Sequence, residues 1–380
     1  MALSKAVISA YARSPFHFAK KGKLADTRPD ELAAQVVKGL LARTGFDPAL
    51  LDDVLLGCAY PEASQGNNLA RIVALLAGLP MAIPGMTVNR FCGSSMSAIH
   101  IAAAQIEAGI GEAYLCVGVE SMTMVPQGGF NFSPNPTLYE HSDTYISMGE
   151  TAENVARSYH VARADQERMA FESHRKAATA RELGLLKDEI IAITTPSGDV
   201  VAEDGCIRPG TSPEALAALK PAFRADGVVT AGTSSPLTDG ASAVLVTSEA
   251  FARRHGLTPT ARIVGIASAG VDPALMGIGP VPASRKALAQ AGITAADLAV
   301  AEVNEAFASQ ALASVRELGI DPAIVNLDGG GMAIGHPLGA TGARITGKAA
   351  ALLARTGGRY ALATQCVGGG QGVATVLEII

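Results

Sequence analysis

The chain of 380 residues is long enough for two domains or more, because single hydrophobic cores usually stop growing near ~250 to 300 residues. Hydrophobic residues make up 48% of the sequence and charged residues only 17%, which favours a compact protein with large buried cores. A net charge of −5, without any Lys/Arg-rich stripe, argues against nucleic acid as the main partner.

The amino terminus has no basic region followed by a sustained apolar stretch, and no later segment approaches ~18 uninterrupted apolar residues. We therefore expect neither secretion nor membrane insertion. Five cysteines form an odd set without Cys-x-x-Cys spacing, which predicts neither a disulfide framework nor a metal site. Reduced thiols fit a cytoplasmic protein. Three of these cysteines, at positions 58, 116 and 206, are interpreted as buried or incidental thiols.

Apolar strand-like segments alternate with helical patterns from the start of the chain, which is typical of an α/β fold. In the first third, strands are predicted at residues 5–9, 53–57, 85–89 and 113–119, and helices at residues 30–42, 69–76 and 94–108. In the last third, strands are predicted at residues 262–266 and 300–303, and helices at residues 283–291 and 305–318.

The first and last thirds of the chain share specific residues as well as the alternation of strands and helices. A Val-Asn pair at Asn89 has a counterpart at Asn326, and each pair is followed by a long small-residue helix and an apolar strand, beginning at Tyr114 and Tyr360. This similarity predicts an internal duplication. Between the halves, a Pro/Gly/Asn-rich stretch at residues 124–137 and two helical patterns, at 151–159 and 164–183, are interpreted as a lid.

A first glycine-rich loop presents Cys92, in the segment Asn-Arg-Phe-Cys-Gly-Ser-Ser. This cysteine follows a predicted strand and precedes a predicted helix, where the helix dipole and unpaired amides favour the thiolate. That help matters because a free thiol with a pKa of ~8.5 is only slightly ionised at neutral pH. We expect a nucleophile here, although an isolated cysteine in this position is also compatible with a small buried residue.

A second loop places His336 directly before a proline, within a run of glycines that ends at Gly342. A histidine on such a constrained loop can take a proton from Cys92 or polarise a thioester carbonyl. A third loop follows Cys366 with Val-Gly-Gly-Gly, whose amides are free to point at an oxyanion. The alternatives are a histidine satisfied inside a turn and a core cysteine at a strand end.

Asn304 lies at the end of a predicted strand, in the segment Asn-Glu-Ala-Phe. Either it has a functional role or it caps the helix predicted to begin at residue 305. Together with the three loops, this segment resembles the signature segments of the thiolase family, and the resemblance extends over essentially the whole chain. It implies a thiolase fold: α/β, with two duplicated halves in five layers (αβαβα) and an inserted lid.

That resemblance places an N-terminal half at residues 1–121, completed by about 236–258, a lid at residues 122–235 and a C-terminal half at residues 259–380. It also implies that Cys92 becomes acylated and that His336 activates it and helps bind the thioester oxygen. Cys366 would move the proton at the acetyl or thiol group. Asn304 would hold a water in one oxyanion hole with His336. The amides of Cys92 and Gly368 would form the second hole.

Coenzyme A is implied as a co-substrate, with no bound cofactor and no metal. Arg208 matches a position that contacts the nucleotide end, and Ser235 a pantetheine contact. Met148 and Phe307 match apolar residues along the pantetheine tunnel. A solvated arginine and a core methionine are the simpler interpretations of two of these positions.

The implied activity is CoA-dependent cleavage of 3-ketoacyl-CoA, as in fatty-acid β-oxidation. Acetoacetyl-specific relatives usually carry histidine where Ser147 stands, which favours the degradative 3-ketoacyl-CoA type over an acetyl-CoA C-acetyltransferase. Two alternatives remain: a condensing enzyme of the ketoacyl synthase kind and a non-catalytic acyl-CoA or lipid-binding protein. The presence of Cys92, Asn304, His336 and Cys366 together argues against both.

A homodimer or homotetramer is usual for the family, and assembly with a fatty-acid oxidation complex is an open alternative. The apolar segment at residues 83–88 is a candidate dimer edge, because unpaired strand edges invite pairing.

Overall fold

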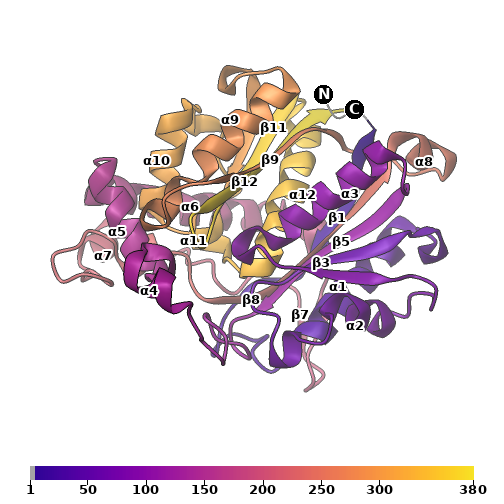
Figure 1. Ribbon diagram of the computed structural model, residues 1–380, viewed down its shortest axis with the longest axis horizontal. Coiled ribbons are helices and arrows are strands. Elements are labelled where there is room, and N and C mark those ends of the chain that lie inside the picture. The colour runs from indigo at the N-terminus through magenta and orange to yellow at the C-terminus, as the bar shows by residue number, and fades with distance from the viewer. Residues whose placement is uncertain (1–4) are drawn as a thin grey trace.

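The computed structural model describes residues 5–380, so the first four residues of the amino-terminal segment considered above lie outside the described part (Figure 1). Helices and strands alternate along most of the chain. The strands are β1 (Ala6–Arg13), β2 (His17–Phe18), β3 (Asp53–Gly57), β4 (Gly85–Val88), β5 (Ala113–Ser121), β6 (Ile193–Thr194), β7 (Val200–Val201), β8 (Thr238–Ser248), β9 (Ala261–Gly270), β10 (Leu298–Val303), β11 (Tyr360–Val367) and β12 (Gln371–Ile379). The α-helices are α1 (Pro29–Thr44), α2 (Leu69–Leu76), α3 (Ser94–Ala108), α4 (Pro136–His141), α5 (Met148–Ser158), α6 (Arg163–Glu182), α7 (Pro213–Ala217), α8 (Glu249–Arg254), α9 (Pro280–Ala291), α10 (Ala308–Leu318), α11 (Gly331–Ile334) and α12 (Leu338–Thr356).

The strand order repeats in the two halves of the chain. The first half runs β4-β3-β5-β8-β1, with β3 parallel to both neighbours and β8 antiparallel to both of its own. The second half runs β10-β11-β12-β9 with the same parallel and antiparallel sequence. A parallel bridge between Ala301 and Val325 puts the latter in the place that β4 takes in the first half. The predicted duplication is therefore visible as a repeated topology.

Helices α3 and α12 pack against each other between the two halves. Met96 and Ile99 of α3 share one apolar cluster with Ile345 and Leu352 of α12. The helices approach closely because Gly342 has no side chain: a Cβ there would lie 2.3 Å from the Met96 nitrogen. Burying each large apolar side chain in this layer contributes ~1.5–3 kcal/mol.

The outer faces of the sheet are covered by separate pairs of helices (Figure 1). Helices α1 and α2 pack on the strands of the first half, and α9 and α10 on those of the second. Along β5, alternate side chains point to the outer and the central helix layers: Leu115 belongs to the outer cluster and Cys116 to the central one. The two halves form one continuous sheet, joined where β1 pairs with β9. With the outer helices and the central α3 and α12, the layers follow the order helix, sheet, helix, sheet, helix, which confirms the expected five-layered arrangement.

The segment between β5 and β8 carries α4 to α7 and two short strands (Figure 1). Helix α5, predicted at residues 151–159, begins three residues earlier at Met148, because the Ser147 hydroxyl caps it by accepting a hydrogen bond from the Glu150 amide. A buried ionic cluster ties this segment to both halves. Arg13 of β1 binds Asp204 at 2.6 Å and Glu189 at 2.8 Å, and Lys348 of α12 binds Glu189 at 2.8 Å.

One boundary differs from the sequence prediction at a position that matters for the site. The predicted helix at residues 305–318 begins only at Ala308. Before it the chain is extended: Phe307 forms a bridge with Ser234, and the Ser235 amide donates to the Ala306 carbonyl at 2.9 Å. Strand-like pairing with a distant segment overrides local helical pattern here, so the helix-cap interpretation of Asn304 is wrong.

Candidate active site

Cys92 lies in a strained turn between β4 and α3. The turn is a short 3-10 helix, Phe91–Gly93, and Phe91 has a φ of 42°, a left-handed conformation that a bulky residue rarely adopts. The hydroxyl of Ser94 accepts from the Arg90 amide at 2.9 Å and donates to the Phe91 carbonyl at 2.6 Å. These bonds hold Cys92 at the start of the fifteen-residue helix α3.

The sequence-based expectation that this cysteine favours the thiolate is not supported by its surroundings in the fold. Burial raises the pKa of Cys92 to about 12, although hydrogen bonds from the Gly368 amide and from its own amide act in the opposite direction. The negative charge of Glu120 raises the pKa further. The cysteine therefore rests as a thiol and needs a proton acceptor before it can attack.

The loop after Cys366 packs directly against the Cys92 turn. The Gln365 side chain donates to the Cys92 carbonyl, and a Cβ on Gly93 would lie only 2.8 Å from Cγ2 of Val367. Because the amides of Gly368 and Cys92 both point at the Cys92 sulfur, they are placed to stabilise an oxyanion that forms beside it.

His336 is buried, and its proton is fixed by one neighbour. Nδ1 lies 2.6 Å from the Thr341 hydroxyl, which itself donates to the Pro337 carbonyl at 2.9 Å. Since the hydroxyl has used its hydrogen, it accepts from Nδ1–H, and Nε2 keeps its lone pair. Burial, with the positive charge of Arg344, lowers the pKa of His336 to about 3, so the ring is neutral.

Asn304 faces this ring from the end of β10. Its Nδ2 lies 3.3 Å from His336 Nε2, and its main-chain amide donates to the Thr364 carbonyl at 2.9 Å. The Oδ1 atom is buried and has no hydrogen-bond partner among the described residues. An unpaired buried carbonyl is costly, so this atom marks a place where a water or a substrate group completes the site.

Cys366 is buried near the end of β11. Burial raises its pKa well above the ordinary value, and ionisation of the neighbouring Cys92 would raise it further, so the two sulfurs share one electrostatic environment. Cys366 thus rests as a thiol. It belongs to one apolar cluster with Phe307 and Met276, against which Met148 packs. Two of the residues expected to line the pantetheine tunnel are therefore beside the second cysteine.

The other two residues expected to bind CoA lie further out. Ser235 is held beside the Asn304 segment by its main-chain bond to Ala306. Arg208 is exposed on the lid, and its guanidinium Nη2 lies 2.9 Å from Nε2 of His174 in α6. Among the described residues, the hydrogen bonds of Arg208 go to His174 and Thr211 and not to the catalytic loops.

Three polar residues at the site escaped prediction: Thr341, Gln365 and Glu120. Thr341 lies within the His336 loop, but nothing in its spacing distinguishes it from a helix-start threonine. Glu120 carried a signal, because it is a lone carboxylate in the otherwise apolar strand β5. A charge inside a buried strand requires specific partners.

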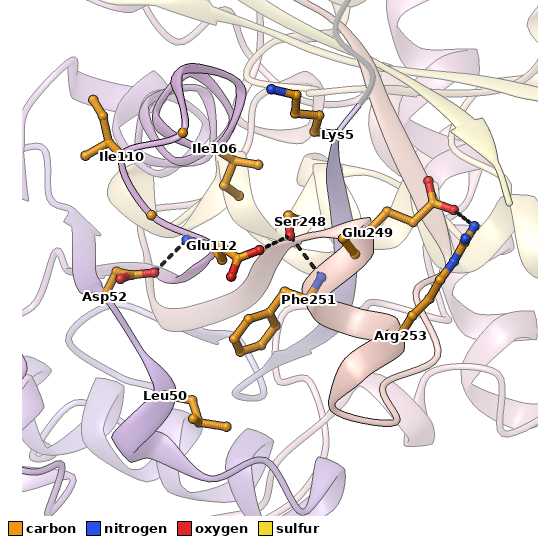
Figure 2. Close-up of a pocket in the computed structure, with 13 residues that line it drawn as sticks. Lys5, Leu50, Asp52, Ile106, Ile110, Glu112, Ser248, Glu249, Phe251 and Arg253 are labelled. Carbon is orange, nitrogen blue, oxygen red and sulfur yellow. Dashed lines mark hydrogen bonds and ion pairs between the residues drawn. The ribbon is translucent and has the colours of Figure 1, made fainter.

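A cavity of about 800 Å³ lies away from these loops (Figure 2). It is lined by the end of α3, the turn before β5, the end of β8 and the start of α8, and its polar lining includes Asp52, Glu112 and Ser248. Asp52 accepts from the Glu112 amide at 2.7 Å, and Glu112 accepts from the Ser248 hydroxyl at 3.0 Å. Since β5 runs from this cavity toward Glu120, the cavity and the catalytic loops lie at opposite ends of the strand.

Among residues 5–380, no three His, Cys, Asp or Glu side chains gather as metal ligands. The helices of that same part are all too short or too polar to span a bilayer.

Comparison with known families identifies two matching regions. Residues 6–250 match the family described as Thiolase, N-terminal domain, and residues 257–379 match Thiolase, C-terminal domain. The 3-ketoacyl-CoA thiolase of Bacillus subtilis is 44% identical over 390 residues, covering 99% of this chain and 100% of that protein.

Two solved structures are closely similar to this fold. The human mitochondrial 3-ketoacyl-CoA thiolase in complex with CoA has a TM-score of 0.92 at 37% identity, covering 100% of this chain and 99% of that one. The acetyl-CoA acetyltransferase of Bacillus anthracis has a TM-score of 0.91 at 41% identity, covering 100% of both chains.

Proposed function

The chain belongs to the thiolase family, and from that premise we propose that it cleaves 3-ketoacyl-CoA with CoA, giving acetyl-CoA and a shortened acyl-CoA through an acyl group on Cys92. The observation that carries this function is that the thiols of Cys92 and Cys366 share one environment, and that Cys92 packs against the cluster of Leu338, two residues after the neutral imidazole of His336. Similar proteins of the same length carry the name 3-ketoacyl-CoA thiolase.

In the first step, His336 accepts the Cys92 proton at Nε2 and the sulfur attacks C3 of the substrate. The C2–C3 bond breaks, and its electrons remain on acetyl-CoA as an enolate. Hydrogen bonds from the His336 side chain and from a water held by Asn304 stabilise the enolate oxygen. The Cys366 thiol then protonates the carbanion, which fits a group whose pKa is raised.

In the second step, the Cys366 thiolate removes the proton of incoming CoA. The CoA sulfur attacks the acyl carbonyl on Cys92, and the amides of Cys92 and Gly368 stabilise the tetrahedral oxyanion. Each such donor contributes ~2.7–4 kcal/mol. The Cys92 thiolate leaves and takes back its proton from His336, which restores the resting thiol and the neutral imidazole.

The CoA molecule would enter beneath the lid at residues 122–235, between the two halves at residues 1–121 with 236–258 and at residues 259–380. The cluster of Met148 and Phe307 beside Cys366 supports a pantetheine path to that thiol. Ser235 would contact the pantetheine, and Arg208 the nucleotide end. The bond between Arg208 and His174 would then be exchanged for a phosphate contact.

An acetoacetyl-CoA-specific acetyltransferase is the second candidate, favoured by the similarity to the Bacillus anthracis structure. Ser147, which caps α5 in the place where such specialists usually carry histidine, favours the degradative enzyme. The role would be fatty-acid β-oxidation in the cytoplasm.

The test is CoA-dependent cleavage of 3-ketoacyl-CoA substrates from acetoacetyl-CoA to a long-chain homologue. Faster turnover on longer chains is the expected result, and Cys92→Ser is expected to trap no acyl group by intact-protein mass spectrometry. Confinement to acetoacetyl-CoA would identify the acetyltransferase. An absence of turnover, or labelled acyl on the Cys92→Ser loop, would contradict the proposal.

We also propose that two copies associate through β4, the strand at one end of the sheet order. Met86 on this strand is 40% exposed and Met81 just before it is 76% exposed. An unpaired edge carrying apolar side chains invites pairing with a second copy. A tetramer, or a complex with a separate oxidation subunit, would build on that dimer.

A further inference from the structure

Glu120 is a completely buried carboxylate that holds three chain segments together. Oε2 accepts from the Ala59 amide at 2.8 Å and from the Gly339 amide at 2.9 Å. Oε1 accepts from the Gln65 side chain at 2.8 Å and from the Tyr60 amide at 3.2 Å. Both oxygens accept from two N–H donors, which favour the ionised carboxylate. Burial acts in the opposite direction and leaves the pKa of Glu120 above its ordinary value.

One of these bonds crosses from the first half of the chain to the second. Gly339 follows His336 by three residues and begins α12 with Leu338. Its backbone is also pressed against the first half, because a Cβ there would lie 2.5 Å from the Val119 carbonyl oxygen and 2.8 Å from the Cys58 Cα. The His336 loop is therefore seated on the end of β5, and Glu120 is the charged group of that seat.

The duplication gives Glu120 a counterpart in the second half. In the β5–β8 pair Glu120 is opposite Gly240, and in the β11–β12 pair Cys366 is opposite Gly372. The strands next to β5 and β11 correspond in the same way: Cys58 directly follows β3, and Asn304 directly follows β10.

This register relates two pairs of side chains. Cys58 and Glu120, with the thiol 3.7 Å from Oε1, occupy in the first half the positions of Asn304 and Cys366 in the second. The first pair has no free polar atom aimed at the nucleophile: its carboxylate is fully used by backbone and side-chain donors. The Glu120 carboxylate instead holds the His336 loop.

We propose that Glu120 is a positioning residue for the acyl-transfer reaction: it fixes the His336 loop against the Cys92 half of the site. The proposal rests on the proposed thiolase activity, because its main consequence is measured in turnover. A displacement of about 1 Å at a reacting group can cost roughly 10²-fold in rate. The Glu120 carboxylate is the charged group that attaches the His336 loop to β5.

A second consequence separates positioning from general stabilisation. The Glu120 charge opposes ionisation of the Cys92 thiol, as does burial, while the Gly368 amide favours it. The other titratable groups near this sulfur are Cys366, which shares its environment, Tyr60, and His336, the proposed proton acceptor. All three are neutral at pH 7. Removing the carboxylate charge should thus make Cys92 easier to ionise even while turnover falls.

The experiment compares Glu120→Asp and Glu120→Gln with wild-type protein. Aspartate keeps the charge but is one methylene too short to reach Gly339 and Ala59 together, so kcat should fall by roughly 10²-fold with little change in KM for CoA. Glutamine keeps the shape and removes the charge. Its kcat should also fall, and the pH profile of Cys92 alkylation by iodoacetamide should move to lower pH.

Asp52→Asn is the matched control. Asp52 also holds two backbone amides at the edge of the same strands, but at the far end shown in Figure 2. It should leave kcat and the alkylation profile unchanged. Cys92→Ser identifies the alkylated thiol, and thermal melts establish that each variant is folded.

Wild-type kcat in folded Glu120→Asp would overturn the proposal, as would a Glu120→Gln profile that does not move. If Glu120→Asp does not fold, the kcat of Glu120→Gln, which keeps the shape of the side chain, tests the same contact, and a wild-type kcat in that variant would overturn the proposal. If the wild-type protein itself cleaves no 3-ketoacyl-CoA, the proposed function fails, whereas the alkylation profile still tests the position of the Glu120 charge.

Discussion

At His336 a single hydroxyl decides which ring nitrogen carries the proton. Thr341 is committed as a donor to the Pro337 carbonyl, so it accepts from Nδ1–H and leaves Nε2 as the base. Because burial lowers the pKa of His336 to about 3, the ring is neutral across the physiological range and able to accept a proton throughout it. Orientation of the ring, and not its titration, should therefore limit activity.

Replacing Thr341 by valine tests this assignment. The change leaves Nδ1–H without its acceptor in a buried site, at a cost of ~1–3 kcal/mol, and frees the ring to adopt the other tautomer. We expect kcat to fall by about 10-fold or more, as measured in steady-state cleavage of a 3-ketoacyl-CoA. Thr341→Ser keeps the hydroxyl and should retain most of the activity; equal losses in both variants would contradict the tautomer assignment.

The residues with reactive groups were predictable, but their supporting partners were not. Cys92, His336 and Cys366 stand out because each lies in a glycine-rich loop of unusual composition. The expectation of a Cys92 thiolate missed the effect of burial, because helix position can be read from the sequence whereas burial cannot. Long-range partners such as Glu120 depend on register between strands that are far apart in the chain.

Among the elements, α12 contributes two buried cations, Arg344 and Lys348, to ion pairs with other segments. Lys348 on this helix is 3% exposed and binds Glu189 at 2.8 Å and Asp328 at 2.7 Å. Although burial alone would raise the pKa of Glu189, the positive charges of Lys348 and Arg13 outweigh it and lower the value to about 2. The cation is thus shared between the lid segment and the second half.

Lys348→Met should destabilise the protein by ~3–5 kcal/mol, because it leaves two buried carboxylates with one partner fewer. The free energy of unfolding, from urea titration, measures the effect. The control is Arg253→Ala, which breaks an exposed pair with Glu249 and should cost ~1 kcal/mol or less. Similar losses in the two variants would mean that the buried cluster adds nothing beyond a surface ion pair.

Element boundaries were predicted correctly where they depend on local sequence features. Helix α3 was predicted at residues 94–108 and is observed as Ser94–Ala108, since its glycine ends and apolar spacing are local features. The start of α10 was missed by three residues because Ala306 and Phe307 are drawn into pairing with residues 234–235. That pairing brings Ser235 beside the Asn304 segment, and no periodicity in either segment predicts it.

For the whole molecule, the duplication was the part of the architecture most accessible from sequence. Similar Val-Asn pairs and similar apolar strands mark corresponding positions, and the repeated strand order follows them. The seating of one half on the other was not accessible, because it depends on close contacts such as Gly342 against Met96. Nothing in the local sequence of either residue indicates that the two will be in contact.

The proposed association through β4 gives a prediction at this largest scale. Met86→Glu places a charge on the exposed edge, where pairing with a second copy would bury it without a partner. We expect the mass measured by light scattering after size exclusion to fall toward the 38.7 kDa of a single chain. Ile110→Glu is the matched control, because Ile110 is 71% exposed on the turn before β5, beside the cavity of Figure 2.

Since Met86 is already exposed, neither substitution should lower the free energy of unfolding of an isolated chain by more than ~0.5 kcal/mol. A loss of assembly in Met86→Glu alone would support association through β4. An unchanged mass in Met86→Glu, or a wild-type protein that runs as a single chain, would contradict it. Because the nucleophile turn follows β4 directly, turnover measured over the same concentration range would show whether association also supports the Cys92 site.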